Sequence, residues 1–159
     1  MQKERIVLYM IFPGYVAIGK TYVSNKDNNF IDLDSYYFKN DNNNCPWYES
    51  YCELAIKLSE SGYNVFTSCH DEVMKYFSSK YDKVIAIYPL LELKQYWLER
   101  ALKRYKQTRT KKDKKAYERI NKYFDEDIKN STSHGVKVIF LDKNDDLESI
   151  CLKAINTIK

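Results

Sequence analysis

The sequence predicts an α/β fold of three layers, in which a five-stranded, mostly parallel sheet carries helices on both faces. Two observations predict it. Short apolar runs of strand length alternate with longer amphipathic segments along the chain, and each run ends at Pro, Gly, Ser or Asp. Such alternation is typical of parallel sheets, because parallel strands need helical crossovers. The 159 residues are also enough for one domain with a single core.

The elements can be placed along the chain from periodicity and from breaking residues. The first predicted strand, residues 4–12, stops at Pro13-Gly14. The remaining strands are predicted over residues 28–33, 63–67, 83–88 and 136–141. Helices are predicted over residues 19–27, 46–61, 70–79, 90–105, 112–129 and 145–158. The Asn-rich residues 39–44 are predicted to be a loop.

The charge of the chain is unevenly distributed. Residues 94–122 hold twelve Lys or Arg and three Asp or Glu, a net charge of +9, whereas the whole chain carries +4 and the remainder therefore −5. This segment covers the two helices within residues 90–129 and their basic linker, residues 106–112, so we expect a basic, hinged lid. A cationic arm favours a phosphate-rich partner, although a solvated helical face explains the same composition.

Composition excludes several classes of protein. The N-terminal residues have no signal-peptide pattern, and no run approaches the ~18 apolar residues of a membrane span. The four cysteines show no C-x-x-C pairing, which argues against a disulfide framework. We therefore expect a reduced, cytoplasmic protein.

The strongest motif is G-x-x-x-x-G-K-[ST], which runs from Gly14 to Thr21 between the first strand and the first helix. In this pattern backbone N–H groups wrap the phosphates of a nucleotide, here ATP, while Lys20 reaches the outer phosphates and Thr21 binds Mg²⁺. The predicted cofactor-binding residues are Gly14, Ala17, Ile18, Gly19, Lys20 and Thr21. Many kinase loops carry glycine where this chain has Ala17, so the loop is expected to be shaped differently there.

Two carboxylates, Asp32 and Asp34, follow the second strand. Residues two apart on a strand share a face, and the end of a strand in an open α/β sheet faces the ligand crevice. We expect Asp32 to be linked to the metal and Asp34 to orient the acceptor hydroxyl as a base, although the two roles can be reversed. The alternative is that Asp34-Ser35 caps a turn or helix.

A third strand end carries Ser68-Cys69-His70-Asp71. His70 is a candidate substrate contact, and a histidine held by local hydrogen bonds at a helix start is the alternative. Nothing in the sequence marks Cys69 as an activated nucleophile.

Arginines of the basic segment are candidates for phosphate contacts, because phosphoryl transfer is stabilised by cations that close over the spreading negative charge. Arg100 and Arg104 lie one helical turn apart and are the predicted catalytic arginines, while Arg109 is a predicted substrate contact.

The middle strands lack the terminal Asp of motor and switch ATPases. Only residues 138–142 resemble that pattern, and because this strand comes last, Asp142 is expected to cap a loop at the sheet edge. The pattern favours a small kinase over a motor.

The layout resembles the small P-loop kinases related to nucleoside monophosphate kinases, shikimate kinase and polynucleotide kinase. More narrowly, it resembles bacteriophage P-loop kinases that include the 5-hydroxymethyluracil DNA kinases. The stretches that carry this resemblance are residues 13–21, residues 30–35, Trp47-Tyr48, residues 87–89, and Leu93-Lys94 with Trp97.

The resemblance implies an ATP- and Mg²⁺-dependent kinase whose acceptor is a hydroxyl on a nucleotide-type molecule, with 5-hydroxymethyluracil in DNA preferred. A free nucleotide or nucleoside monophosphate kinase and a polynucleotide 5′-hydroxyl kinase are alternatives. A nucleotide-binding regulatory module that transfers nothing is an alternative from another class.

Overall fold

A computed structural model describes residues 8–39 and 46–157 as an α/β fold with two small parallel sheets. The strands are β1 (Ile11–Pro13), β2 (Phe30–Asp32), β3 (Asn64–Thr67), β4 (Ile85–Pro89) and β5 (Lys137–Leu141). The helices are α1 (Lys20–Lys26), α2 (Tyr36–Lys39), α3 (Trp47–Glu60), α4 (Asp71–Lys80), η1 (Leu91–Leu93), α5 (Lys94–Thr108), α6 (Lys111–Asn130) and α7 (Leu147–Thr157). Strands and helices alternate as predicted, except that α2 was not expected.

The single five-stranded sheet that the sequence predicts is not formed by the described residues. Strands β1, β3 and β2 make one sheet in the order β1-β3-β2, and β4 pairs with β5 in another. Strand β1 still runs beside β4, because Ile11 N–H donates to Lys83 O and Tyr15 N–H donates to Ile87 O, each at 3.0 Å. Two isolated parallel bridges join the strands there.

Pro13 explains the interruption between the two sheets. Residues 11 and 15 both direct their N–H groups toward the β4 segment, and alternation along a strand would direct the N–H of residue 13 the same way. Proline has no N–H, so the ladder loses its central donor. The proline that ends the predicted strand thus also divides the sheet.

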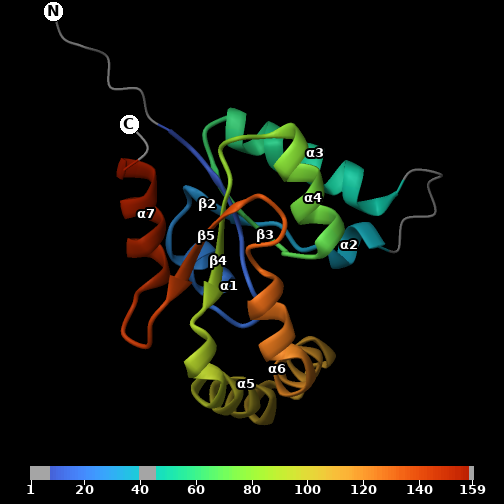
Figure 1. Cartoon of the computed structure of the whole chain (residues 1–159), viewed down its shortest axis with the longest axis vertical. Coiled ribbons are helices and arrows are strands. Elements are labelled where there is room, and N and C mark those ends of the chain that lie inside the picture. Colours follow the sequence, from blue (N-terminus) through green and yellow to red (C-terminus); the bar gives the residue numbers. More distant parts are fainter. Residues whose placement is uncertain (1–7, 40–45, 158–159) are drawn as a thin grey trace, which may run out of the picture.

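Helices cover both faces of the strands, as predicted. In Figure 1 the strands lie between α7 on one side and α3 and α4 on the other. Alternate side chains of β1 explain this, because Ile11 packs in the buried cluster with α3 and α4, and Phe12 in the cluster with α1 and α7. Residues 8–39 and 46–157 include no helix with the length and apolar character needed to cross a bilayer.

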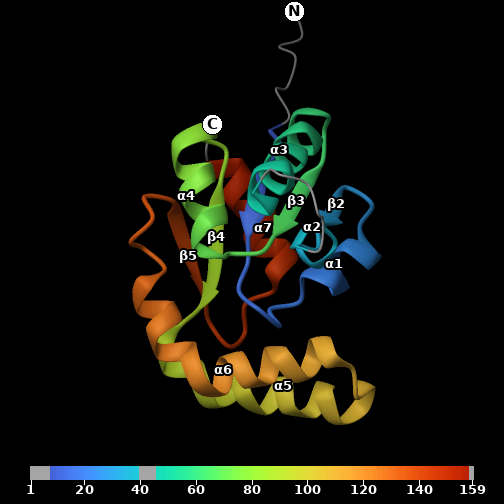
Figure 2. The same cartoon turned by 90° about the vertical axis from the view of Figure 1, so that its right-hand side faces the viewer.

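The predicted lid is a tight pair of helices. Helices α5 and α6 lie side by side beneath the strands in Figure 2, and the β4 strand points toward α5 in Figure 1. The predicted linker, residues 106–112, is mostly helical, and only Arg109 and Thr110 separate the two helices. Buried residues of both helices, Trp97 and Phe124 among them, belong to the same core cluster as Phe12. The pair therefore shares the main core of the protein.

Other predictions can be compared directly with the structure. Cys52, Cys69 and Cys151 are unpaired, while Cys45 lies outside the described residues, as does the start of the first strand. Of the loop predicted over residues 39–44, Lys39 ends α2 and residues 40–44 lie outside the described residues. Asp142 lies in a turn after β5, and its Oδ1 accepts from Lys143 N–H at 2.7 Å, in agreement with the predicted cap.

Candidate active site at the strand ends

The loop from Gly14 to Thr21 is anchored between two strands. Gly14 N–H donates to Thr67 O of β3 at 2.9 Å, and Tyr15 N–H donates to the β4 residue Ile87. The loop then enters α1 through Gly19, whose φ of 105° is in the left-handed region. These anchors place the start of α1 at the carboxyl ends of the strands, where a helix N-terminus favours phosphate.

Gly14 and Lys20 fit each other closely. The Lys20 ammonium donates to Gly14 O at 2.8 Å, so the side chain curls back over the loop. A Cβ added at Gly14 would lie 2.9 Å from Lys20 Cδ and from Ile18 Cδ1. Any side chain at position 14 would therefore displace Lys20, which explains glycine at the first position of the motif. Burial is the main cause that lowers the pKa of Lys20, and the charges of Asp32 and Asp34 oppose it.

Ala17 adopts the backbone that a glycine usually supplies. Its φ of 64° lies in the left-handed region, which costs a residue with a Cβ about 1–2 kcal/mol. The expected difference in the loop is thus a strained alanine at this position.

Asp32 is joined to the loop by a hydrogen bond, because Thr21 Oγ1 donates to Asp32 Oδ2 at 2.8 Å. A hydroxyl and a carboxylate that meet in this way suit Mg²⁺, which takes hard oxygen ligands and usually keeps waters and substrate phosphates as well. Within residues 8–39 and 46–157, no group of three His, Cys, Asp or Glu side chains forms a complete metal cage. Thr21 and Asp32 would thus supply two oxygen ligands and leave the other coordination positions to water or phosphate.

Asp34 has both a local and a long-range partner. Its Oδ1 accepts from Tyr36 N–H at 3.0 Å, so the capping alternative is confirmed for one oxygen. Its Oδ2 lies 3.4 Å from the ammonium of Lys112 on α6. The second oxygen thus faces α6 of the helix pair.

A buried tyrosine ties the two ends of the site together. Tyr51 of α3 donates its hydroxyl to Leu33 O at 2.6 Å and accepts from Ser68 N–H at 2.8 Å. It therefore fixes the segment between Asp32 and Asp34 against the segment that precedes His70. Nothing in the sequence singles out Tyr51 among fifteen tyrosines.

His70 is held by local hydrogen bonds, the alternative that the sequence left open. Its Nε2 lies 2.7 Å from Lys39 Nζ and its Nδ1 lies 2.8 Å from Ser68 Oγ. An ammonium only donates, so Nε2 accepts and Nδ1 carries the proton. Burial lowers the pKa of His70 to about 4, and the charge of Lys39 adds to this effect. His70 nevertheless lines the cavity described next.

A cavity of ≈ 530 Å³ lies between the loop, the ends of β3 and β4, and α6. This is the size of a site for a small molecule. Two cations, Lys20 and Arg119, and four carboxylates, Asp71, Glu72, Glu126 and Asp127, lie in its wall. Tyr15, Tyr88 and Tyr123 add aromatic surface. Cys69 also lines it, and burial raises the pKa of its thiol, which argues against a nucleophile.

The arginine in this cavity, Arg119, is not among the three that the sequence predicts at the site. Arg119 of α6 binds Asp127 with Nε at 2.8 Å and Nη2 at 2.5 Å, and its guanidinium lies 4.7 Å from the centre of the Tyr123 ring. Asp127 also accepts from the Tyr15 hydroxyl at 2.7 Å. Asp127 therefore joins the phosphate loop to the arginine.

The three predicted arginines lie elsewhere. Arg100 donates to the Tyr96 hydroxyl at 2.8 Å, and Arg109 ends α5 over the ring of Tyr105. Arg104 lies 3.2 Å from the buried Asp113. None of the three is among the described residues that line the cavity, but neither are Thr21, Asp32 and Asp34, so the cavity lining alone does not separate the arginines from the candidate site. Arg100 and Arg109 lie over rings of their own helix, and Arg104 pairs with Asp113 of α6. These contacts do not support the predicted placement of the three arginines at the site.

Asp113 shows what Arg104 does. Burial by itself would raise the pKa of Asp113, but the hydroxyls of Thr108 and Thr110 and the charge of Arg104 outweigh it and hold this pKa below its usual value. Thr110 Oγ1 also accepts from Asp113 N–H at 3.2 Å, which caps α6. Arg104 thus stabilises the turn between the two helices.

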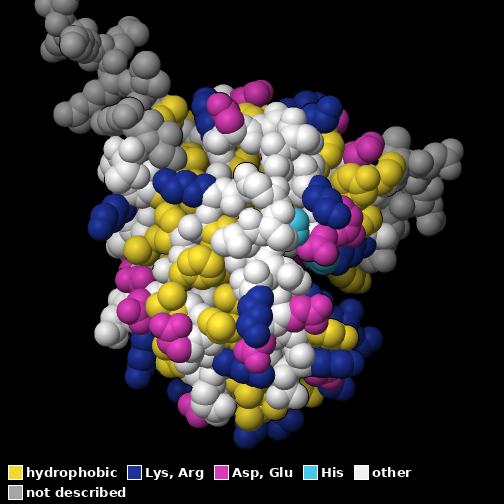
Figure 3. Space-filling model, viewed as in Figure 1, with side chains coloured by type: hydrophobic (Ala, Val, Ile, Leu, Met, Phe, Trp, Pro, Cys, Tyr) yellow, Lys and Arg dark blue, Asp and Glu magenta, His cyan; other side chains and the backbone are white. Residues whose placement is uncertain are grey.

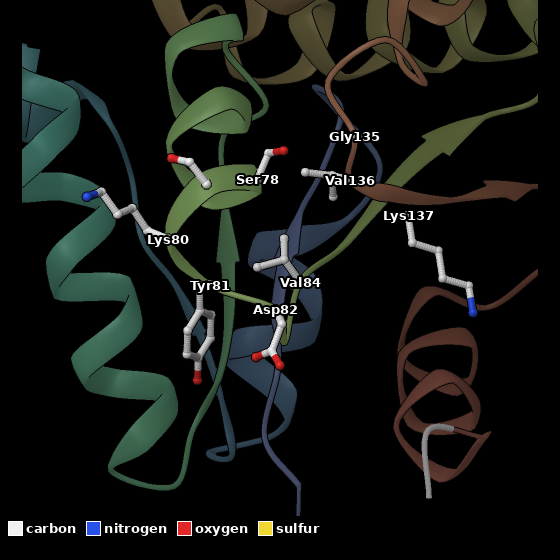
Figure 4. A pocket seen from close by; sticks show the side chains of 9 residues that line it. Ser78, Lys80, Tyr81, Asp82, Val84, Gly135, Val136 and Lys137 are labelled. Atoms are coloured by element: carbon white, nitrogen blue, oxygen red, sulfur yellow. The ribbon is translucent and has the colours of Figure 1, made fainter.

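A second hollow of ≈ 570 Å³ opens where β4 and β5 begin. Lys80, Asp82 and Lys137 line it, but Figure 4 shows the two lysine side chains directed to opposite sides, away from each other. The two lysines therefore do not converge on one point of this hollow.

No protein-family model matches this chain, and no curated protein sequence matches it. The geometry at the strand ends is therefore what indicates a function.

Proposed function

We propose that this protein is an ATP- and Mg²⁺-dependent phosphotransferase of the P-loop kinase type, acting on a hydroxyl of a nucleotide-type acceptor. The observation that carries the proposal is the hydrogen bond from Thr21 to Asp32 beside Lys20. It brings the phosphate loop and a strand-end carboxylate to one point, with Asp34 two residues further along the chain. A nucleotide-binding loop alone would not need the second carboxylate.

Each residue has a role that its position supports. The loop N–H groups and Lys20 would hold the triphosphate, and Thr21 and Asp32 would hold Mg²⁺. The bound metal would neutralise charge on the phosphates. Asp34 would orient the acceptor hydroxyl and take its proton. Arg119, which Asp127 fixes at the cavity wall, would take the role first expected of Arg100 and Arg104.

The strand arrangement is compatible with such a kinase. Because β1 runs beside β4, the five strands follow the order β2-β3-β1-β4-β5 across the molecule. We propose that this is one functional five-stranded unit of the P-loop kinase type, with α5 and α6 as its lid.

The cavity favours a neutral acceptor group. With Lys20 assigned to the triphosphate and Arg119 paired with Asp127, the cavity wall still carries Asp71, Glu72 and Glu126. These carboxylates disfavour the extra phosphate of a free nucleoside monophosphate. This supports a hydroxyl on a base or sugar, and we retain 5-hydroxymethyluracil in DNA as the preferred acceptor. The basic helix pair supports a polymer, because each neutralised phosphate adds salt-dependent affinity.

The test is a transfer assay with γ-labelled ATP and Mg²⁺. The acceptors are single-stranded oligonucleotides containing 5-hydroxymethyluracil, unmodified oligonucleotides with a free 5′-hydroxyl, and free nucleotides. Label in the modified oligonucleotide supports the preferred acceptor, and label only in the unmodified ends or free nucleotides supports one of the two alternatives. Tight ATP binding with no labelled product from any acceptor would support the regulatory module and overturn the kinase.

Two variants tie the activity to the site. Lys20→Ala and Asp34→Asn should each lower turnover by at least about 10²-fold, as expected for groups that act mainly in the transition state. Lys26→Ala is the matched control, since Lys26 lies on the same helix as Lys20 and only contacts Glu148 at 3.7 Å. Full activity of Asp34→Asn would show that Asp34 is not the base.

A further inference from the structure

Two neighbouring tyrosines beside Asp34 are open to solvent. Tyr36 and Tyr37 are 63% and 78% exposed, and their rings pack edge to face with centroids 5.7 Å apart. Tyr36 is tied to the site, because its N–H donates to Asp34. A tyrosine ring is a large apolar surface, and two of them exposed together leave much of that surface for a partner to cover.

Lysines from two separate parts of the chain flank these tyrosines. Lys39 ends α2, two residues after Tyr37, while Lys112 reaches from α6 to within 3.4 Å of Asp34 and is 66% exposed. Burial lowers the pKa of Lys39, and the charge of Lys115 on α6 acts in the same direction. Like charges that the fold brings together repel one another, and an anionic partner would relieve that repulsion.

The wider surface has the same character. In Figure 3 Lys and Arg side chains recur along the lower edge and the lower right of the molecule, where α5 and α6 lie. Lys111, Lys112, Lys114 and Lys115 make the first turn of α6 strongly cationic and exposed. Asp34 therefore lies between an aromatic pair and the cationic end of a helix.

We propose that Tyr36, Tyr37, Lys39, Lys112 and Lys115 form a binding surface for single-stranded nucleic acid that delivers a nucleotide to Asp34. The bases stack on the two tyrosines and the backbone phosphates contact the lysines, the combination found in proteins that bind single strands. The proposal rests on the proposed function only for the role of Asp34.

The geometry selects a single strand over other anions. In a duplex the faces of the bases are stacked on each other, so no base face is free to stack on the rings of Tyr36 and Tyr37. A free nucleotide offers one base and one phosphate group, fewer than the two rings and three cations of the surface. An acidic peptide would contact the lysines but has no flat rings to match Tyr36 and Tyr37.

The test measures binding without ATP or Mg²⁺, by fluorescence anisotropy of a labelled 12-nucleotide oligothymidine with the full chain. We expect binding at least ~10-fold tighter than to a duplex of the same length, with little competition from thymidine monophosphate. Tyr36→Ala with Tyr37→Ala should weaken binding by about 10- to 100-fold, because stacking contributes about 1–3 kcal/mol per base. Tyr63→Ala is the control, since Tyr63 is also exposed but precedes β3 at the opposite end of the strand.

Salt dependence tests the lysines. Each phosphate contact on a single strand contributes about −0.7 to the slope of log K against log salt concentration. Lys112→Gln with Lys115→Gln should therefore make the slope shallower by about 1.4, whereas Lys153→Gln on α7 should leave it unchanged. The tyrosines and lysines substituted in these two tests are all exposed, and circular dichroism verifies that each variant protein folds.

Three results would overturn the proposed surface. They are equal affinity for duplex and single strand, equal effects of the tyrosine pair and of Tyr63→Ala, or competition by polyglutamate as effective as that by oligothymidine. Failure of the kinase is distinguishable, because strand binding through these residues with no phosphoryl transfer retains the surface and removes the phosphotransferase. Phosphoryl transfer to free nucleotides without strand binding would retain the phosphotransferase and overturn the binding surface.

Discussion

The hydroxyl of Tyr15 in the phosphate loop donates a 2.7 Å hydrogen bond to Asp127 of α6, and the same carboxylate binds Arg119 through two nitrogens. A residue of the loop that would hold the triphosphate is thus coupled to the arginine that would close over it. Burial is the largest cause that raises the pKa of Tyr15, and its hydrogen bond to Asp127 adds to the effect, so the hydroxyl stays a donor. The position of α6 and the shape of the loop therefore depend on each other.

Breaking this network should affect turnover more than nucleotide binding. We expect Asp127→Asn to lower kcat by about 10- to 100-fold, because Arg119 loses the charge that orients it. Tyr15→Phe keeps the ring and removes one hydrogen bond, which should lower the free energy of unfolding by about 1 kcal/mol. Asp125→Asn is the control on the same helix, where Asp125 makes an exposed contact with Lys94. Equal kinetics of Asp127→Asn and Asp125→Asn would contradict a role for the network.

The arginines should separate into two groups when each is changed to lysine. Arg119→Lys loses the planar fork that binds Asp127 and should lower kcat by at least about 10²-fold, since arginines at phosphoryl-transfer sites contribute about 10³- to 10⁵-fold. Arg104→Lys should instead lower the free energy of unfolding by at most about 1 kcal/mol, because its half-exposed ion pair with Asp113 stabilises the turn between α5 and α6. Steady-state kinetics and urea unfolding of the two variants measure this difference. A larger loss of turnover in Arg104→Lys than in Arg119→Lys would instead support Arg104 as a catalytic arginine, as the sequence predicts.

Local patterns predicted most of the fold. Helix α3, for example, begins and ends within one residue of the expected range, because its apolar spacing and the Gly62 that follows it are properties of the segment itself. The short helix α2 was missed, since four residues are too few to show a helical period. The division of the sheet was missed because it depends on the direction in which Pro13 would have donated, and this requires knowing which strands are neighbours.

In the candidate site, too, the residues that depend on local patterns were predicted and those that depend on packing between elements were not. The hydrogen bond between Thr21 and Asp32 agrees with the expectation that the two residues share one metal site, whereas their binding of Mg²⁺ and the binding of phosphate by Lys20 stay predictions. The choice of Arg119 over Arg100 and Arg104 depends on how two helices rotate against the core, which spacing along one helix does not determine. Arg119 and Asp127 are also eight residues apart, beyond the three- and four-residue spacings by which helical ion pairs are recognised.

The strained alanine in the loop gives a test of stability. Ala17→Gly should raise the free energy of unfolding by about 0.5–1 kcal/mol, because relief of about 1–2 kcal/mol of strain exceeds the added entropy of an unfolded glycine. The control is Ala116→Gly within α6, where glycine should lower this free energy by about 1 kcal/mol. Urea unfolding measures both changes. Destabilisation of similar size in the two variants would show that residue 17 does not hold the left-handed conformation.

The low pKa of His70 predicts how stability depends on pH. The folded chain keeps the ring neutral down to about pH 4, whereas the unfolded chain takes up a proton near pH 6.5. Between these values the unfolded state binds more protons, so His70 makes the free energy of unfolding fall as the pH decreases. The full effect is on the order of 1–3 kcal/mol after allowance for the partial exposure of the ring.

Two variants isolate this contribution. In His70→Gln the titrating group is absent, so the difference in unfolding free energy between wild type and variant should shrink as the pH is lowered from about 7 to 4. In Lys39→Met the neighbouring charge is removed while the ring remains buried, so the pKa of His70, followed by NMR of the imidazole, should rise toward its ordinary value. A wild-type His70 that titrates near pH 6.5 would mean that the ring is neither desolvated nor held by Lys39. In that case Ser68 and Lys39 do not fix the ring, and His70 is free to contact an acceptor directly.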